Sequence, residues 1–167
     1  IRRPRPDDYQ IKQAADLIKK SKNPIIISGG GVFYSDAMKE LSQFAKKHNI
    51  PTAQTVMGYS TMKKDDPYFL GAIGGFGGKA PNDFMKKTDL AIAIGTKLAD
   101  FTTGSWTNFE NPNFKLVSIN VSRFDANKHM AQSIVGDAKV SIQDLTVALG
   151  SWKASDDWYK KSRSAVN

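Results

Sequence analysis

The stretch NPIIISGGGV, residues 23–32, decides how this chain folds. It contains a continuous run of β-branched apolar residues and then three glycines in a row. A run that is apolar at every position is typical of a strand covered on both faces, as in a parallel sheet. The glycines that follow it predict a tight turn into the next element. The stretch therefore predicts a buried strand followed directly by a turn.

Working outward, strands and helices alternate along the chain. Apolar residues at helical spacing predict a helix over 7–22, with Asp7 and Asp8 at its start, and Ser35 is expected to cap a second helix over 35–49. The further strands are expected at 50–56, 89–95, 114–121 and 132–137, with helices at 79–88 and 138–150. This order predicts an α/β fold: a three-layer α/β/α Rossmann-like domain with a mostly parallel sheet of five or six strands.

The chain has 167 residues, which suits one domain with its own core. We expect residues 1–7 to be a linker, 8–150 to form the domain, and 151–167 to be a terminal helix or a linker. The chain begins at Ile1 rather than at methionine, and we expect it to be part of a longer polypeptide.

Composition narrows the possible functions. There is no cysteine, which excludes disulfides, thiolate catalysis and cysteine-bound zinc, and fits a cytoplasmic location. No apolar run is long enough to span a membrane, so no membrane partner is expected. The net charge is +8, but the lysines come in scattered pairs without interleaved aromatics, so no nucleic-acid partner is expected.

Groups suited to acid–base chemistry are few. The chain has two glutamates, Glu40 and Glu110, and two histidines, His48 and His129. Glu40 and His48 are expected on the solvent-facing side of one helix, and no spacing suggests a catalytic triad or a cluster of metal ligands. We therefore predict no catalytic residue and no metal site in this chain.

Three loops that follow strands are candidate binding segments, because open α/β sheets bind ligands beyond the carboxyl ends of their strands. They are SGGG at 28–31, GTKLADFTTGSW at 95–106 and NVSRFD at 120–125. In GGGVFY, Gly29 and Gly31 match the first two glycines of a dinucleotide fingerprint, but Tyr34 replaces the third. These glycines serve a tight turn or present backbone amides to a phosphate, and the two roles are compatible.

The second segment is ADFTTGSW, residues 99–106. Thr102, Thr103 and Ser105 offer hydroxyls, and Gly104 allows close approach of the backbone. Trp106 is either a packing anchor or part of a ligand or domain interface.

The order of these motifs resembles that of a known family. The pieces NPIIISGGGV, IPTAQT, DDPYFLGAIGGFG, TDLAIAIGTKLADFTTG, KLVSINV and SIVGDAKVSIQDL are similar to the central domain of thiamine-diphosphate-dependent enzymes of the acetolactate synthase and pyruvate oxidase type. The resemblance covers about residues 8–149. ADFTTGSW and FDANKH look most like the branch of that family that hydrolyses a C–C bond of a cyclic trihydroxy-dione in myo-inositol degradation.

The resemblance implies that catalysis takes place outside this chain. In such enzymes, thiamine diphosphate and Mg²⁺ are held by a pyrimidine-binding and a diphosphate-binding domain that flank the central domain. The chain would be an inactive fragment by itself, with a structural or interface role in a homo-oligomer. Residues 102–106 would line the access to the active site or an interface.

In flavin-bearing relatives the central domain holds the ADP part of FAD. The corresponding positions here are vestigial candidates for a nucleotide site: Gly29, Gly30, Gly31, Gly74, Gly75, Lys97 and Asn120. Lys97 stands where the family has arginine, and Asn120 replaces an acid that could hold ribose, so FAD is not expected. The alternatives are a module that binds FAD, ADP or NAD, and the central domain of an acetolactate synthase-like enzyme.

Overall fold

The computed structural model describes residues 2–166; residues 1 and 167, at the ends of the two expected terminal segments, lie outside this range. Six parallel strands form one sheet in the order β3-β2-β1-β4-β5-β6. The strands are β1 (Pro24–Ser28), β2 (Thr52–Gln54), β3 (Phe69–Ala72), β4 (Leu90–Ile94), β5 (Lys115–Asn120) and β6 (Gln132–Val135).

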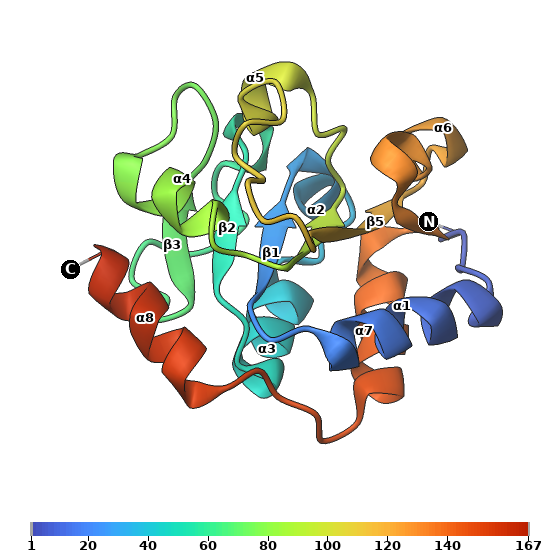
Figure 1. The fold of residues 1–167 in the computed structure, drawn as a ribbon. Helices are drawn as coiled ribbons and strands as arrows, with labels where there is room; N and C mark the ends of the chain where they lie inside the picture. The colour runs from blue at the N-terminus through green and yellow to red at the C-terminus, as the bar shows by residue number, and fades with distance from the viewer. Residues whose placement is uncertain (1, 167) are drawn as a thin grey trace.

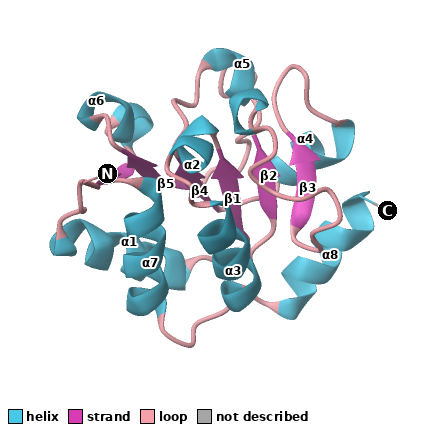
Figure 2. Cartoon of the chain, turned by 180° about the vertical axis from the view of Figure 1, so that it is seen from behind, coloured by secondary structure: helices cyan, strands magenta, loops and turns pink. Residues whose placement is uncertain are grey.

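Helices cover both faces of the sheet (Figures 1 and 2). One face is packed by α1 (Asp8–Lys20), α3 (Met38–His48) and α7 (Ala138–Leu149), and the other by α4 (Lys79–Met85) and α8 (Asp156–Val166). Short helices lie in the connections that follow strands: α2 (Gly30–Tyr34), η1 (Val56–Gly58), α5 (Asp100–Thr103), α6 (Arg123–Ala126) and η2 (Lys128–Met130). This confirms the three-layer α/β/α prediction.

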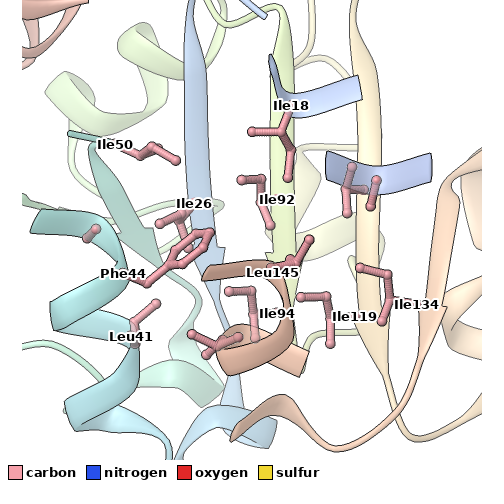
Figure 3. Packing of buried hydrophobic residues seen from close by; sticks show 14 of the residues in the cluster. Ile18, Ile26, Leu41, Phe44, Ile50, Ile92, Ile94, Ile119, Ile134 and Leu145 are labelled. Atoms are coloured by element: carbon pink, nitrogen blue, oxygen red, sulfur yellow. The ribbon is translucent and has the colours of Figure 1, made fainter. Parts of the chain in front are cut away.

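The pleat of the strands divides the interior into two cores. Successive strand residues point to opposite faces, so Ile26 packs under α3 and α7, while Ile25 and Ile27 pack toward α4 and α8. Figure 3 shows the first core, where Phe44 of α3 and Leu145 of α7 lie against the isoleucines of the sheet. Both faces are apolar because both are covered, which is why the strands read as continuous apolar runs.

The strand order creates a switch point between β1 and β4. Chain connections leave β1 toward β2 on one side and β4 toward β5 on the other. The loops after these two strands therefore diverge and leave a crevice at the carboxyl edge of the sheet. The segments α2, α5 and α6 lie at this edge, at the top of Figure 1.

The structure differs locally from the sequence-based expectations. It adds to the five expected strands the short edge strand β3, whose four residues are too few to show a clear pattern. The prediction that Ser35 caps the second helix is wrong. Asp36 has a positive φ of 50° and separates α2 from α3, whose N-cap is Ala37 without a side-chain bond. Ser35 Oγ instead donates to Asp137 Oδ2 at 2.6 Å.

The two terminal segments are both packed against the body. Residues 2–7 form no helix or strand, but Pro6 is buried and the Pro4 carbonyl accepts from the Asp137 amide at 2.9 Å. At the other end, Trp158 of α8 is buried and stacks on Phe84 with ring centroids 4.2 Å apart. The domain boundaries at residues 8 and 150 stay predictions.

The prediction that Glu40 and His48 face solvent is wrong. His48 is fully buried, and its Nδ1 lies 2.8 Å from the Trp152 carbonyl oxygen. It follows Phe44 by four residues, so it continues the apolar stripe of α3, and the two rings lie 4.8 Å apart. The Glu40 side chain is only 16% exposed and lies 3.4 Å from Lys139 Nζ.

The position of His48 predicts a pH-dependent stability. Burial lowers the pKa of His48 below its ordinary value of 6.5, although the bond to Trp152 opposes this shift. The unfolded chain therefore binds a proton first, so this stabilisation is complete above pH 6.5 and is lost as the pH falls below it. Urea unfolding at about pH 5.5 and about pH 7.5 should give a lower free energy at the lower pH, by at most about 1.4 kcal/mol per unit. His48→Gln should flatten this dependence; an unchanged dependence in the variant would contradict the assignment.

Candidate functional site

Two clefts lie side by side at the carboxyl edge of the sheet. The first, of about 450 Å³, lies beyond β1, β2 and β4 and has mostly apolar walls, including Tyr34, Met57 and Phe101. The second, of about 380 Å³, lies beyond β4, β5 and β6 and is more polar, with Asn120 and Asp125 in its walls. Gly31, Tyr34, Gly95 and Lys97 line both clefts. The structure thus places the switch-point crevice where the strand order requires it.

The glycine turn after β1 is packed directly against the loop after β4. The Gly29 amide donates to the Ile94 carbonyl and the Gly31 amide to the Gly95 carbonyl, each at 2.9 Å. A Cβ on Gly29 would lie 2.4 Å from the Gly95 oxygen, and one on Gly31 would lie 2.6 Å from Gly95 Cα. Two of the three glycine amides are therefore used inside the protein, and the geometry favours the tight-turn interpretation.

Gly74 and Gly75 support an aromatic wall of the first cleft. The Gly75 amide donates to the Phe101 carbonyl at 3.0 Å, and a Cβ on Gly75 would lie 2.7 Å from the Phe101 ring. Asn82 fixes Gly74 by accepting from its amide and donating to its carbonyl. Phe76 then lies against Phe101, with ring centroids 4.8 Å apart. These two glycines hold apolar surface in place rather than offering a phosphate cradle.

Polar groups of the second cleft are also engaged within the protein. The Asn120 side chain donates to the Thr96 carbonyl at 3.2 Å and accepts from the Ser122 amide at 3.0 Å. Asp125, which lies in the candidate loop NVSRFD but is not among the predicted site residues, supplies a carboxylate here. A hydrogen bond from Lys128 lowers the pKa of Asp125, with smaller help from Ser122 and Lys97. Its place at the carboxyl end of β5, within FDANKH, is the signal that could have identified it.

The loop at 99–106 is folded on itself. Thr103 is buried and its Oγ1 accepts from the Trp106 amide at 3.1 Å, while Gly104 ends α5 in the left-handed conformation. Trp106 is half-buried, stacked on His129 at 4.2 Å and packed against Phe109 at 4.7 Å. Of the five candidate residues Thr102, Thr103, Gly104, Ser105 and Trp106, Thr102 is the one that lines the first cleft.

The residues present do not fit a thiamine diphosphate, Mg²⁺ or FAD site. Within residues 2–166, no group of three or more histidine, cysteine or carboxylate side chains could hold a metal ion. The crevice lacks free glycine amides at Gly29 and Gly31 for a diphosphate, and Asn120 offers no carboxylate for a ribose. We therefore derive no catalytic step from this chain.

Comparison with known proteins identifies the family. Residues 11–145 match the family model described as the central domain of thiamine pyrophosphate enzymes. The chain belongs to this family. The match is to one domain of a larger kind of enzyme.

Curated relatives of this central domain share a name. A 3D-(3,5/4)-trihydroxycyclohexane-1,2-dione hydrolase of Clostridium perfringens (strain 13 / Type A) is 44% identical over 89% of this chain, and one of Clostridium botulinum is 45% identical over 87%. A Bacillus cereus protein of the same name, numbered 1, is 42% identical over 87%. The chain covers 22–23% of these relatives, so it spans less than a quarter of their length.

Across residues 2–166, the helices of the central domain are too short or too polar to cross a bilayer.

Proposed function

We propose that this chain is the non-catalytic central domain of a thiamine-diphosphate-dependent hydrolase that cleaves a C–C bond of a cyclic trihydroxy-dione in myo-inositol degradation. The observation that carries the proposal is 42–45% identity, over most of the chain, to relatives named as hydrolases of such a dione. The cofactor and Mg²⁺ would be held by flanking domains of the same polypeptide. A homo-oligomer in the cytoplasm completes the proposal, and the absence of cysteine fits that compartment.

The domain's own contribution would be structural. Its two cores and engaged glycine amides support a rigid body, and its carboxyl edge offers apolar walls and the Thr102 hydroxyl. A nucleotide-binding role is less well supported, because the amides of Gly29 and Gly31 already have partners. An acetolactate synthase-like role lacks support from the relatives quoted above, which are named as hydrolases.

The test is turnover by the longer polypeptide that contains this chain. We expect it to open the ring of 3D-(3,5/4)-trihydroxycyclohexane-1,2-dione only when thiamine diphosphate and Mg²⁺ are added, while the 167-residue chain alone is inactive. Condensation of pyruvate in place of ring opening would favour the synthase alternative. Ring opening by the isolated chain would overturn the non-catalytic assignment.

Substitution of Trp106 tests whether the loop over 99–106 has a part in substrate access or in an interface. Trp106→Ala removes a half-buried ring from the cluster with Phe109 and His129, and we expect a loss of about 2 kcal/mol in unfolding free energy. In the longer polypeptide the loosened loop should also lower kcat/KM, and Trp106→Phe should preserve most of both quantities. If Trp106→Ala leaves kcat/KM and assembly unchanged, the loop has no part in substrate access or in an interface.

A further inference from the structure

Exposed apolar side chains gather at one edge of this domain. Among the described residues, all the exposed large hydrophobic side chains except Tyr9 and Val147 lie in the segments that directly follow strands β1 to β5. Tyr9 and Val147 are on α1 and α7 instead. Five of the exposed side chains, Tyr34, Val56, Met57, Phe76 and Phe101, line one cleft, and exposed apolar side chains clustered in this way mark an interaction site.

Four of these exposed side chains form an apolar patch around the first cleft. Tyr34, Met57, Phe76 and Phe101 are 80%, 72%, 78% and 54% exposed, and all four line the cleft of about 450 Å³. Lys97 is the one charged residue in its lining. A surface complementary to this cleft is therefore an apolar projection that carries a carboxylate opposite Lys97.

The N-terminal arm, residues 3–6, is held at the carboxyl end of β6, against residues that line the second cleft. Arg3 Nη1 donates to Ser35 Oγ and to Asp137 Oδ2, both at 3.0 Å, and the Pro4 carbonyl accepts from the Asp137 amide. A Cβ on Gly136 would lie 2.9 Å from the Pro6 nitrogen, so the arm is in close contact with the carboxyl end of β6. The arm therefore lies at the carboxyl edge of the sheet, next to the end of β6.

The arm fixes where preceding polypeptide would leave the domain. Ser35, to which Arg3 is bonded, is next to Tyr34, and Tyr34 lines the first cleft. A domain joined to the start of the arm would begin next to the exposed aromatic residues, without needing a long linker. Its effective concentration at the patch would be high, which favours docking even when the interface is modest.

We propose that the cleft bounded by Tyr34, Met57, Phe76 and Phe101 docks the domain that precedes residue 1 in the longer polypeptide, through an apolar projection with a carboxylate facing Lys97. This rests on the proposed function only in requiring that the chain be the central domain of a longer protein. Glycines that do not form a phosphate site help to build this surface. Gly74 and Gly75 pack closely against Phe101, and Gly31 lines the cleft.

Site-specific photo-crosslinking in the longer polypeptide tests the occupant. The photoreactive residue p-benzoylphenylalanine is placed at Met57, with a matched control at Tyr9, which is similarly exposed on α1. We expect an intramolecular cross-link from position 57 to a peptide that precedes residue 1, and none from position 9. A cross-link to a second copy, a cross-link to polypeptide that follows residue 167, or no cross-link at position 57 each overturns the proposal.

A second measurement uses polar substitutions. Met57→Gln with Phe76→Ser removes exposed apolar surface without touching either core, and Tyr9→Ser with Val147→Gln is the matched control. We expect limited proteolysis at the junction before residue 1 to become about tenfold faster in the first variant and to stay unchanged in the control. Equal rates in both variants would count against docking.

The ring-opening assay on the same polypeptide separates the two proposals. Hydrolysis of the dione without a cross-link from position 57 overturns the docking surface alone. A cross-link without hydrolysis leaves the docking surface standing and overturns the enzymatic assignment.

Discussion

Gly29→Ala is expected to lower the unfolding free energy by about 4 kcal/mol or more, which removes much of the stability of an ordinary domain. The added Cβ would lie 2.4 Å from the Gly95 oxygen and 2.6 Å from Thr96 Cβ. Both neighbours belong to the loop after β4, which itself is hydrogen-bonded to β5 through the Gly95 amide. The clash cannot be relieved by a side-chain rotation, so the two loops of the switch point must separate. Urea unfolding followed by circular dichroism measures the loss.

Gly78→Ala is the control for this substitution. Gly78 has an ordinary φ of −71°, and the nearest contact of an added Cβ is the Pro81 side chain at 3.3 Å. We expect a change of about 1 kcal/mol or less. If Gly29→Ala is as mild as Gly78→Ala, the close packing of the two glycine loops is not what the domain depends on.

Asp137→Ala is expected to lower the unfolding free energy by about 3 kcal/mol, because one carboxylate serves four partners. Asp137 Oδ1 caps α7 by accepting from the Lys139 and Val140 amides, and Oδ2 accepts from Ser35 Oγ at 2.6 Å. Asp137 also pairs with Arg3, whose side chain is 26% exposed. The substitution leaves Ser35 without its strongest acceptor and frees the N-terminal arm. Chemical denaturation gives the stability, and amide exchange of residues 3–6 reports the arm.

Asp144→Ala provides the comparison for Asp137. Asp144 pairs with Arg5 at 2.8 Å, but the Arg5 side chain is 68% exposed. Exposed pairs contribute about 1 kcal/mol or less, so this variant should remain close to wild type. Equal losses in the two variants would show that the cap and the Ser35 bond contribute nothing beyond a surface ion pair.

The layered architecture could be predicted from the sequence because the strands are buried on both faces. Runs such as that over 24–28 contain no polar residue until Ser28, and a run of this kind has few alternatives to a covered parallel strand. β3 was missed because Phe69–Ala72 is a short edge strand with partly exposed residues. The prediction that His48 is exposed to solvent relied on the polarity of histidine. Its spacing from Phe44 instead puts it on the buried stripe of α3.

The position of the candidate site could be predicted from the sequence. Which of its groups are free to bind a ligand could not. Loops that follow parallel strands meet at one edge, so Gly31, Lys97 and Asn120 were expected near one another, and all three line the second cleft. Whether a glycine amide is free depends on the partner loop, and nothing local in GGGVFY reveals the Gly95 carbonyl. The exposure of Met57 and Phe76 likewise depends on how distant segments pack.

The measurement that most directly tests the central claim, that this domain supplies structure and a surface rather than a cofactor site, is calorimetric titration of the 167-residue chain with FAD, ADP, NAD and thiamine diphosphate with Mg²⁺. We predict no binding tighter than about 1 mM for any of them, because the amides of Gly29 and Gly31 are already bonded. A dissociation constant below about 10 μM for a nucleotide, equivalent to about −7 kcal/mol, would contradict the account.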